Sequence, residues 1–309
     1  MKPRILTVGR VHVETSMVLP YVPSSGHMVK GKDISRYPGG SAVNTAIALS
    51  KLGAESIISG RVGSDSNGKR VSGYLASKDV DVRYLEEDAI HPTGCLVRIT
   101  EESGSSRGAF FDGANLKLSA QDIEFAYKSY PQGTLISADA PDEAIQAALA
   151  YGAREGVPTM LDARFDRAEL LSLSRLQSVS VLLMDGELAE KYTGIEPGTV
   201  EKSLRCCIAL SGMISARYYV LHLKDRGIFS YDGMYHRVVP TYDLPEGGCV
   251  ATDAYFAAAL FAKYIASGDM KASTEFAAVA EAAAKGRSGS AAALPSAEEL
   301  RHFIEELKN

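Results

Sequence analysis

The sequence contains no apolar run that approaches the roughly 18 residues needed to span a membrane as a helix. Near the amino terminus it offers only the short stretch ILTV at residues 5–8, too little for the core of a signal peptide. It also lacks a long basic run, and its formal charge is −5, so no segment is expected to bind the phosphate backbone of a nucleic acid. We therefore expect a cytoplasmic protein that crosses no membrane and binds no nucleic acid.

Cysteine is scarce, and the four cysteines form no CxxC pair and no cysteine–histidine spacing of a structural zinc site. Reduced thiols in a cytosolic protein are the simplest interpretation. The fingerprint of dinucleotide-binding oxidoreductases is missing too, because no predicted strand is followed by GxGxxG and then by an acidic residue about 20 positions later. The sequence thus disfavours a structural zinc site and a nucleotide-dependent oxidoreductase.

Short apolar runs alternate regularly with amphipathic or alanine-rich segments. This alternation is typical of strands joined by crossover helices, so we expect an α/β fold around a mostly parallel sheet. The 309 residues are 46% hydrophobic, enough to bury a sizeable core. We predict strands at residues 5–8, 56–59, 134–137, 159–162, 179–184 and 218–223. We predict helices at 42–52 and 142–155, each followed by a glycine, and a last helix that begins with a capping box of Ser296 and Glu299.

Two segments, residues 11–37 and 93–111, interrupt this rhythm with short alternating runs broken by glycine, proline and serine. Such runs predict β-hairpins, which we expect to form a small sheet that acts as a lid over one edge of the main domain. A further hairpin is predicted at residues 228–238, turning at Asp232 and Gly233. We treat residues 1–309 as a single domain that carries this lid.

The segment GGCVATDAYF, residues 247–256, places paired glycines before Thr252 and Asp253 and then enters a helix of small and apolar residues. Free backbone N–H groups at a helix start attract phosphate, and the helix dipole keeps a carboxylate there ionised. Asp253 is therefore suited to accept a proton from a hydroxyl that attacks a phosphoryl group. The alternative is that Thr252 or Asp253 only caps the helix.

A second segment, PGGSAVNTAIALSKLG at residues 38–53, puts Gly39 and Gly40 at a helix start and Asn44 one turn further on. Paired glycines let a ligand approach the backbone, and an amide both donates to and accepts from hydroxyl groups. Glu14 follows a predicted strand and is expected at the sheet edge where α/β folds bind ligands. The alternatives are a plain loop with a solvent-facing Asn44, and an ordinary surface glutamate.

In this order along the chain, these segments resemble the ribokinase-like (PfkB) family of carbohydrate and nucleoside kinases, from about residue 9 to about residue 300. The motif GGSAVNTAIALSKLGAESIISGRVGSDSNG at residues 39–68 is similar to the family's first signature. DGAN at 112–115, AEKYTGI at 189–195 and GSAAALP at 289–295 resemble later family segments. The resemblance implies a three-layer α/β sandwich with a β lid, an acceptor site between the two, and ATP in a groove along the carboxyl-terminal half.

The resemblance also implies roles for single residues. Asp253 matches the family's catalytic base. The residues that match acceptor-binding positions, or lie near them, are His12, Glu14, Gly39, Gly40, Asn44 and Arg107. His12 and Glu14 stand where the family often has asparagine and aspartate, which implies a pocket of different shape. Arg107, in the second lid hairpin, either reaches an anionic part of the substrate or is a solvated lid charge.

The nucleotide side departs further from the family pattern. The family loop DTTGAGD reads GGCVATD here and keeps only Ala251 and Asp253. Backbone N–H groups of Val250, Ala251 and Thr252 are expected to form an anion hole, although valine disfavours the positive φ that such a loop uses. The other expected nucleotide contacts are Asp185, Glu187, His222, Lys224, Gly227 and Ala278, and Glu187 is also the expected Mg²⁺ ligand.

The sequence thus predicts a kinase that uses ATP and Mg²⁺ to phosphorylate a hydroxyl of a sugar or sugar-like small molecule. Because the departures from the family pattern cluster at the phosphate-donor end, a sugar-binding homologue with weak or lost catalysis is the alternative. The lid exposes a strand edge that a second subunit could cover, so a homodimer through the lid is a further expectation.

Overall fold

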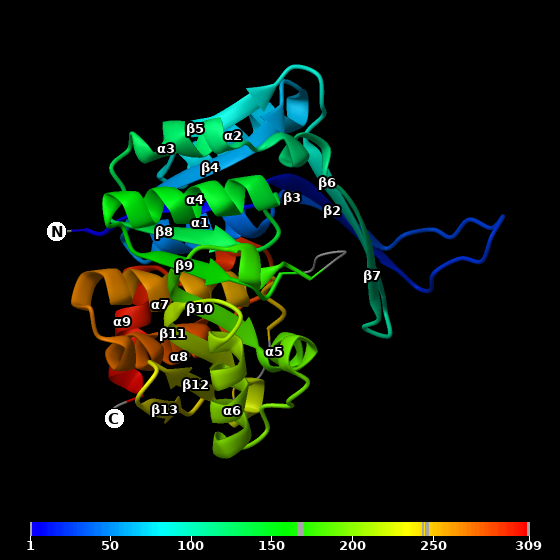
Figure 1. Cartoon of the computed structure of the whole chain (residues 1–309). Coiled ribbons are helices and arrows are strands. Elements are labelled where there is room, and N and C mark those ends of the chain that lie inside the picture. Colours follow the sequence, from blue (N-terminus) through cyan, green and yellow to red (C-terminus); the bar gives the residue numbers. More distant parts are fainter. Residues whose placement is uncertain (1, 166–169, 243, 245–246, 308–309) are drawn as a thin grey trace.

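The computed structural model describes residues 2–165, 170–242, 244 and 247–307, and its centre is a nine-stranded sheet in the order β13-β12-β11-β10-β9-β8-β1-β4-β5 (Figure 1). The pairs β11–β12 and β12–β13 are antiparallel, and the other neighbouring pairs are parallel. The predicted mostly parallel α/β fold is confirmed. The strands are β1 (Arg4–Val8), β4 (Glu55–Gly63), β5 (Val80–Asp88), β8 (Gly133–Ser137), β9 (Thr159–Asp162), β10 (Val179–Asp185), β11 (Ala216–His222), β12 (Ile228–Tyr231) and β13 (His236–Val239).

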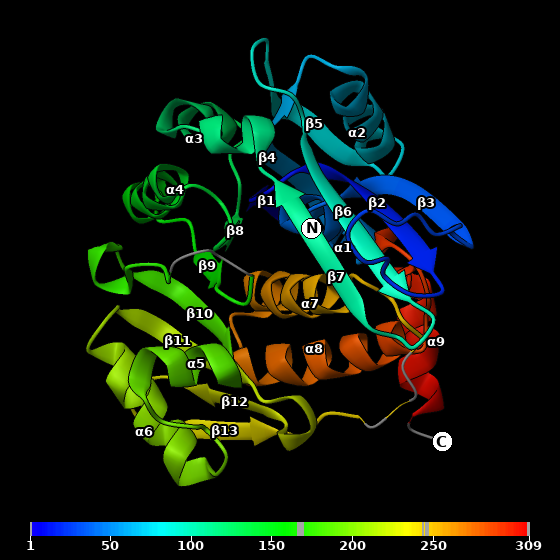
Figure 2. The ribbon, with the colours of Figure 1, turned by 90° about the vertical axis from the view of Figure 1, so that its right-hand side faces the viewer.

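Helices cover both faces of this sheet, which gives the three layers expected from the resemblance (Figure 2). One face packs against α1 (Ser41–Lys51), α2 (Ser66–Ala76), α7 (Thr252–Ser267), α8 (Met270–Lys285) and α9 (Ala297–Glu306). The other packs against α3 (Ala120–Tyr127), α4 (Asp142–Glu155), α5 (Gly186–Thr193) and α6 (Val200–Ser211). Four short 3-10 helices complete the described elements: η1 (Gly113–Lys117), η2 (Leu173–Arg175), η3 (Lys224–Arg226) and η4 (Ala291–Ala293).

The strand β1 shows why these apolar runs form a doubly covered sheet. Successive side chains of a strand point to opposite faces. Ile5 accordingly packs in the core on the α1 and α7 side, and Leu6 packs in the core on the α3 and α4 side, both with no exposed surface. A strand buried on both faces must be apolar throughout, which explains the short continuous apolar runs in the sequence.

A second, four-stranded sheet has the order β3-β2-β6-β7 and lies beside the main body (Figure 1). Its strands are β2 (His12–Leu19), β3 (Asp33–Gly39), β6 (Gly94–Glu101) and β7 (Ser106–Phe111). The two predicted hairpins are confirmed, because β2 pairs antiparallel with β3 and β6 pairs antiparallel with β7. The hairpins join through a parallel β2–β6 pair. Segments far apart in the sequence therefore form one small sheet.

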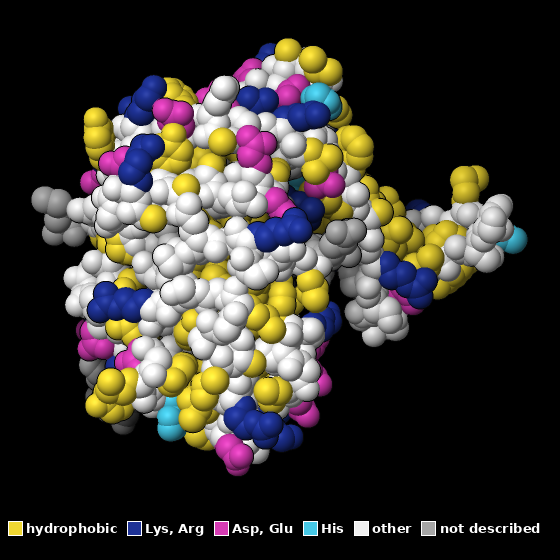
Figure 3. All heavy atoms as spheres, viewed as in Figure 1, with side chains coloured by type: hydrophobic (Ala, Val, Ile, Leu, Met, Phe, Trp, Pro, Cys, Tyr) yellow, Lys and Arg dark blue, Asp and Glu magenta, His cyan; other side chains and the backbone are white. Residues whose placement is uncertain are grey.

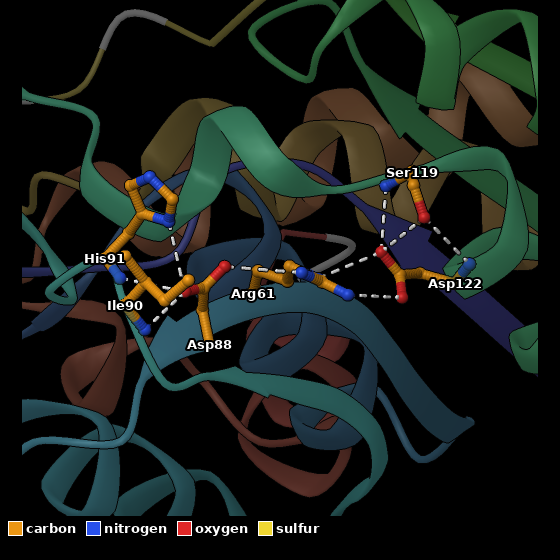
Figure 4. A network of polar contacts seen from close by, with 6 residues as sticks. All are labelled: Arg61, Asp88, Ile90, His91, Ser119 and Asp122. Atoms are coloured by element: carbon orange, nitrogen blue, oxygen red, sulfur yellow. Dashed lines mark hydrogen bonds and ion pairs between the residues drawn. The ribbon is translucent and has the colours of Figure 1, made fainter.

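The connections into the second sheet are tied to the main sheet by partly buried polar contacts. On β4, Arg61 contacts the carboxylates of Asp122, at 3.0 and 3.1 Å, and of Asp88, at 3.4 Å (Figure 4). Asp88 ends β5 and accepts from the backbone N–H groups of the turn that leads to β6. Asp65 caps α2 and also accepts from the N–H and hydroxyl groups of Thr93. These contacts fix the place where the second sheet leaves the domain.

Two local structures predicted from short sequence patterns, a capping box and a hairpin, are confirmed. The last helix begins with the capping box predicted for Ser296 and Glu299. The hairpin predicted at residues 228–238 is the antiparallel pair β12–β13. None of the described helices is long and apolar enough to cross a membrane.

Candidate active site

The helix α7 starts at Thr252, as the pattern of residues 247–256 predicts. Its N-cap is Ala251, which makes no side-chain capping bond, and the Thr252 hydroxyl donates to the carbonyl oxygen of Cys249 at 3.0 Å. The alternative that Thr252 or Asp253 only caps the helix is therefore wrong. Asp253 is the second residue of α7, and 74% of its side chain is exposed.

A groove of about 900 Å³ runs past the amino end of α7. It lies at the carboxyl edge of the main sheet, because Asp185 ends β10 and His222 ends β11. Ligands bind at this edge in open α/β sheets. The acidic, basic and histidine side chains in its lining are Arg164, Asp185, His222, Lys224, Asp225, Asp253, Glu281 and Lys285.

Two of the predicted nucleotide residues in this lining are held by specific bonds. One Asp185 carboxylate oxygen accepts from the N–H of Leu188 at 2.7 Å and so caps α5. The Nε2 atom of His222 lies 2.9 Å from the Glu281 carboxylate, and both side chains are buried. Burial raises the pKa of Glu281, but the hydrogen bond and charge of His222 and the charge of Lys285 outweigh it, so the net shift is downward. The floor of the groove is therefore polar.

Other predicted nucleotide residues lie at the rim or outside the groove. Glu187 and Lys224 are exposed and form an ion pair of 2.8 Å with each other. Gly227 has a φ of 94° and follows η3. The prediction that Ala278 contacts the nucleotide is wrong, because Ala278 is 2% exposed and packs in the hydrophobic core. The residues of α8 that line the groove are Glu281 and Lys285, one and two turns further on. Among the described residues, no cluster of three or more metal-ligating side chains occurs.

The expected anion hole is only partly available. The N–H of Val250 donates to the carbonyl oxygen of Gly289 at 3.0 Å, so the prediction is wrong for Val250, whose N–H is already bonded. Its side chain is 48% exposed and is not part of the groove lining. The first N–H groups of any helix have no intrahelical partner, which applies here to Thr252 and Asp253. Ala251 is the N-cap residue and directly precedes these two residues in the chain.

The predicted acceptor residues His12 and Glu14 lie together on β2. Glu14 is buried, and one of its oxygens accepts from Arg98 on β6 at 2.7 Å. His12 is 7% exposed, and neither ring nitrogen has a hydrogen-bond partner among the described residues. Burial lowers the pKa of His12 to about 4, with the charges of Arg10 and Arg98 acting in the same direction. The imidazole is therefore neutral near pH 7.

The paired glycines hold the chain close to this cluster. Gly40 has a φ of 112°, and a Cβ atom there would lie 2.3 Å from the carbonyl oxygen of Arg10. Only glycine fits such a position. A Cβ atom at Gly39 would lie 3.1 Å from Nε2 of His12. Asn44 lies on α1, half-buried, and its N–H donates to the carbonyl oxygen of Gly40.

Arg107 lies at a distance from these residues along the second sheet. It pairs with Ile99 on β6, whereas His12 pairs with Gly94 at the other end of that strand. Its side chain is 71% exposed and approaches Glu101 at 3.9 Å. A solvated lid charge is the interpretation that this geometry favours.

Several site residues escaped the sequence analysis. The Ser41 hydroxyl donates to Asp139 at 2.6 Å and accepts from the N–H of Arg10. The Arg10 guanidinium lies 3.2 Å from the Asp112 carboxylate and 4.4 Å from the centre of the Phe110 ring. Burial raises the pKa of Asp139, and Ser41 and Arg10 oppose this shift only in part. Their position in the sequence could have indicated them, because Arg10 and Asp139 each follow a strand of the parallel sheet by two residues.

Arg164 was missed as well. It follows β9 by two residues, and its Nη1 atom lies 3.2 Å from the carboxylate of Asp253. The same strand-end signal applies to it.

The family model for "pfkB family carbohydrate kinase" matches residues 4–297. The chain belongs to the pfkB family of carbohydrate kinases. Among curated members it is 20% identical over 307 residues to the ribokinase of Haemophilus influenzae, with 99% of each chain covered. It is 25% identical over 312 residues to an ATP-dependent ribose-1-phosphate kinase of Halopiger xanaduensis, with 98% of each covered.

A solved structure of Arabidopsis thaliana ribokinase complexed with ribose and ATP matches the fold with a TM-score of 0.88. The match covers 99% of both chains at 19% identity. At this identity the likeness shows the ribokinase-like fold alone.

Proposed function

We propose that this pfkB family member is an ATP-dependent kinase that phosphorylates a hydroxyl of a sugar or sugar-like small molecule. The observation that carries the proposal is the Asp253 carboxylate, which is exposed on the wall of the groove at the amino end of α7. A carboxylate beside helical N–H groups is suited to accept a proton next to a bound phosphoryl group. The names of the relatives, two of them kinases of ribose or its phosphate, support the same reaction class.

The acceptor would bind at the cluster of His12, Glu14, Gly40 and Asn44. Both ring nitrogens of His12 and the Nε atom of Arg10 lack partners among the described residues, and buried polar groups normally have them. Sugar hydroxyls would supply those hydrogen bonds, because a hydroxyl both donates and accepts. The second sheet, built from most of residues 11–37 and 93–111, would act as a lid of the single domain.

ATP would lie in the groove, whose volume falls within the roughly 300–1,000 Å³ usual for ligand pockets. Mg²⁺ in such enzymes is held by one or two carboxylates together with the phosphates. Asp185 and Glu187, at the start of α5, fit this role through the oxygens that Leu188 and Lys224 do not contact. When bound, the ion neutralises charge on the phosphates.

The chain's own groups would act mainly by position and charge. Asp253 would take the acceptor proton late in the transfer, and the N–H groups of Thr252 and Asp253 would stabilise the charge on the phosphoryl oxygens. Closure of the second sheet over the acceptor would exclude water and so suppress ATP hydrolysis.

A second candidate function is sugar binding without efficient catalysis. It is favoured by the anion-hole loop, where Val250 replaces a glycine of the family motif and its N–H is bonded to Gly289. One transition-state hydrogen bond of this kind is worth a factor of about 100 to 1,000 in kcat. The two candidates differ in turnover, not in sugar affinity.

A screen with two readouts tests the proposal. A thermal-shift panel of sugars, sugar phosphates, sugar acids and nucleosides, with and without MgATP, identifies the ligand, because a ligand that binds only the folded state stabilises it by RT ln(1 + [L]/Kd). ADP release is then measured with the ligands that stabilise the protein. We expect one ligand to raise ADP release at least tenfold and to be phosphorylated mole for mole. A stabilising sugar with no dependent ADP release would support the binding homologue instead.

A further inference from the structure

The guanidinium of Arg164 is held in one orientation by the carboxylate of Asp162. Nε of Arg164 donates to one Asp162 oxygen at 2.9 Å, and Nη2 donates to the other at 2.8 Å. The exposed fractions of the two side chains are 5% and 1%. Burial alone would lower the pKa of Arg164, but the charges of Asp162 and Asp253 raise it above its ordinary value. Arg164 is therefore a fixed positive charge.

The same guanidinium is directed at the amino end of α7. Nη1 donates to the Asp253 carboxylate at 3.2 Å, and Nη2 donates to the Asp253 carbonyl oxygen at 2.8 Å. The guanidinium carbon of Arg164 lies over the ring of Phe256, one turn along α7, at 5.3 Å from the ring centre. One arginine thus contacts both the side chain and the backbone of Asp253, and it also lines the groove.

The ion pair with Asp162 compensates for burying the charge of Arg164. It does not explain why the Arg164 guanidinium also contacts Asp253. The Asp253 side chain is 74% exposed, so it needs no partner for stability, and an exposed ion pair contributes little. A buried cation at the transfer point has a chemical use, however. The phosphoryl group in transfer carries spread negative charge, and an arginine beside it lowers the barrier substantially. Val250 stands where the family loop has a glycine, and its N–H is bonded to Gly289, which leaves that charge less stabilised.

We propose that Arg164 is a functional residue of the transfer site that positions the Asp253 carboxylate and supplies positive charge to the transferring phosphoryl group. This inference rests on the proposed kinase function. Arg164 lies just after β9, outside all the sequence motifs, so none of those motifs indicates this role.

The test uses the full chain with Arg164→Met and Arg164→Lys. Arg154→Met is the matched control, because Arg154 is exposed on α4 and pairs with Glu155 on the same helix. Loss of Arg164 leaves the buried Asp162 unpaired, which is costly. The double variant Asp162→Asn with Arg164→Met removes that charge and covers the case in which the single variant does not fold.

Two probes are titrated: MgADP alone, and MgADP with aluminium fluoride, which mimics the phosphoryl group in transfer. We expect Arg164→Met and the double variant to weaken binding of the fluoride complex at least 100-fold while binding of MgADP changes less than threefold. Arg164→Lys should recover part of the loss. With the acceptor found by the screen, kcat should fall at least 100-fold and the acceptor KM should change less than threefold. A residue with a purely structural role would weaken both probes equally.

The outcomes separate this inference from the proposed function. If wild type turns over no acceptor yet binds the fluoride complex in an Arg164-dependent way, the sugar kinase proposal fails and the role of Arg164 stands. If the variants keep the wild-type ratio of the two affinities, the inference is wrong whatever the wild-type activity is. If wild type binds neither probe, both are overturned.

Discussion

A single neutral histidine lies in the cluster that we propose binds the acceptor. His12 is buried between two arginines, Arg10 and Arg98, and its imidazole packs edge-on against Phe110. A protonated ring there would add a third positive charge to a desolvated site. The neutral ring can instead donate one hydrogen bond and accept another, as recognition of a polyol requires.

This burial predicts a pH-dependent loss of stability. The pKa of His12 is about 4 in the folded protein, against 6.5 without burial. Above pH 6.5 the ring is neutral in both states, but as the pH falls from 6.5 to 4 only the unfolded chain binds the proton. Between pH 7 and pH 5, wild type should lose about 2 kcal/mol more unfolding free energy than His12→Asn, measured in urea. His302→Asn, at an exposed site, serves as the control and should behave as wild type. Equal losses in wild type and His12→Asn would contradict the assignment.

Single residues were predictable where a motif carries them. Gly40 and Asp253 could be singled out because each lies in a short stretch with its own backbone chemistry, and their roles in binding and catalysis stay predictions. Arg164 and Asp139 were not, because their functional partners, Asp253 and Ser41, are about a hundred residues away in the chain. Only the parallel sheet brings those strand ends together, and one sequence does not reveal which strands are neighbours.

At the scale of elements, the Arg61 network joins the strands β4 and β5 to α3 (Figure 4). The Asp88 and Asp122 side chains are 9% and 8% exposed. Removing the arginine would leave Asp122 buried without a counter-charge and Asp88 with His91 as its remaining ion-pair partner. Backbone N–H groups of Ile90 and His91 also bind Asp88, so its position sets the turn before β6.

We expect Arg61→Met to lower the unfolding free energy by about 2–3 kcal/mol. The matched control is Arg83→Met, because Arg83 also contacts an aspartate through two nitrogens but is 73% exposed. That pair should contribute less than about 1 kcal/mol. Urea unfolding monitored by circular dichroism measures both. A loss for Arg61→Met no larger than that for Arg83→Met would show that the network does not stabilise the fold.

Strands were predictable where both of their faces are buried. All six predicted strands are found in the main sheet, because a strand buried on both faces must be apolar throughout. The strand β5 lies at the sheet edge and carries five charged residues in VDVRYLEED, so it was not predicted. The helix α2 was not predicted either, since only Gly68, Val71 and Leu75 of its residues are buried.

At the scale of the whole molecule, the cluster around His12 and Glu14 and the groove come from different halves of the chain, and both adjoin the carboxyl edge of the main sheet. The N–H of Ala138 donates to the carbonyl oxygen of Asp162, and the charge of Asp162 acts on the neighbouring Asp139. Asp139 contacts Ser41, which follows the paired glycines, and Asp162 contacts Arg164 in the groove lining. The second sheet and the β2–β3 connection bear exposed apolar side chains, among them Met28, Ile34 and Phe111. Figure 3 shows yellow side chains on the projecting part of the molecule. A lid that closes, or a second subunit, would cover such a surface.

The central claim is that Asp253 accepts the acceptor proton where these two sites meet. The most direct measurement compares kcat and sugar affinity in wild type, Asp253→Asn and Asp142→Asn, the last of which makes the same charge change in the first turn of another helix, outside the groove. We predict that Asp253→Asn lowers kcat by a factor of about 100 to 10,000 with sugar Kd changed less than threefold, and that Asp142→Asn keeps kcat within about threefold. Wild-type kcat in Asp253→Asn would contradict the account.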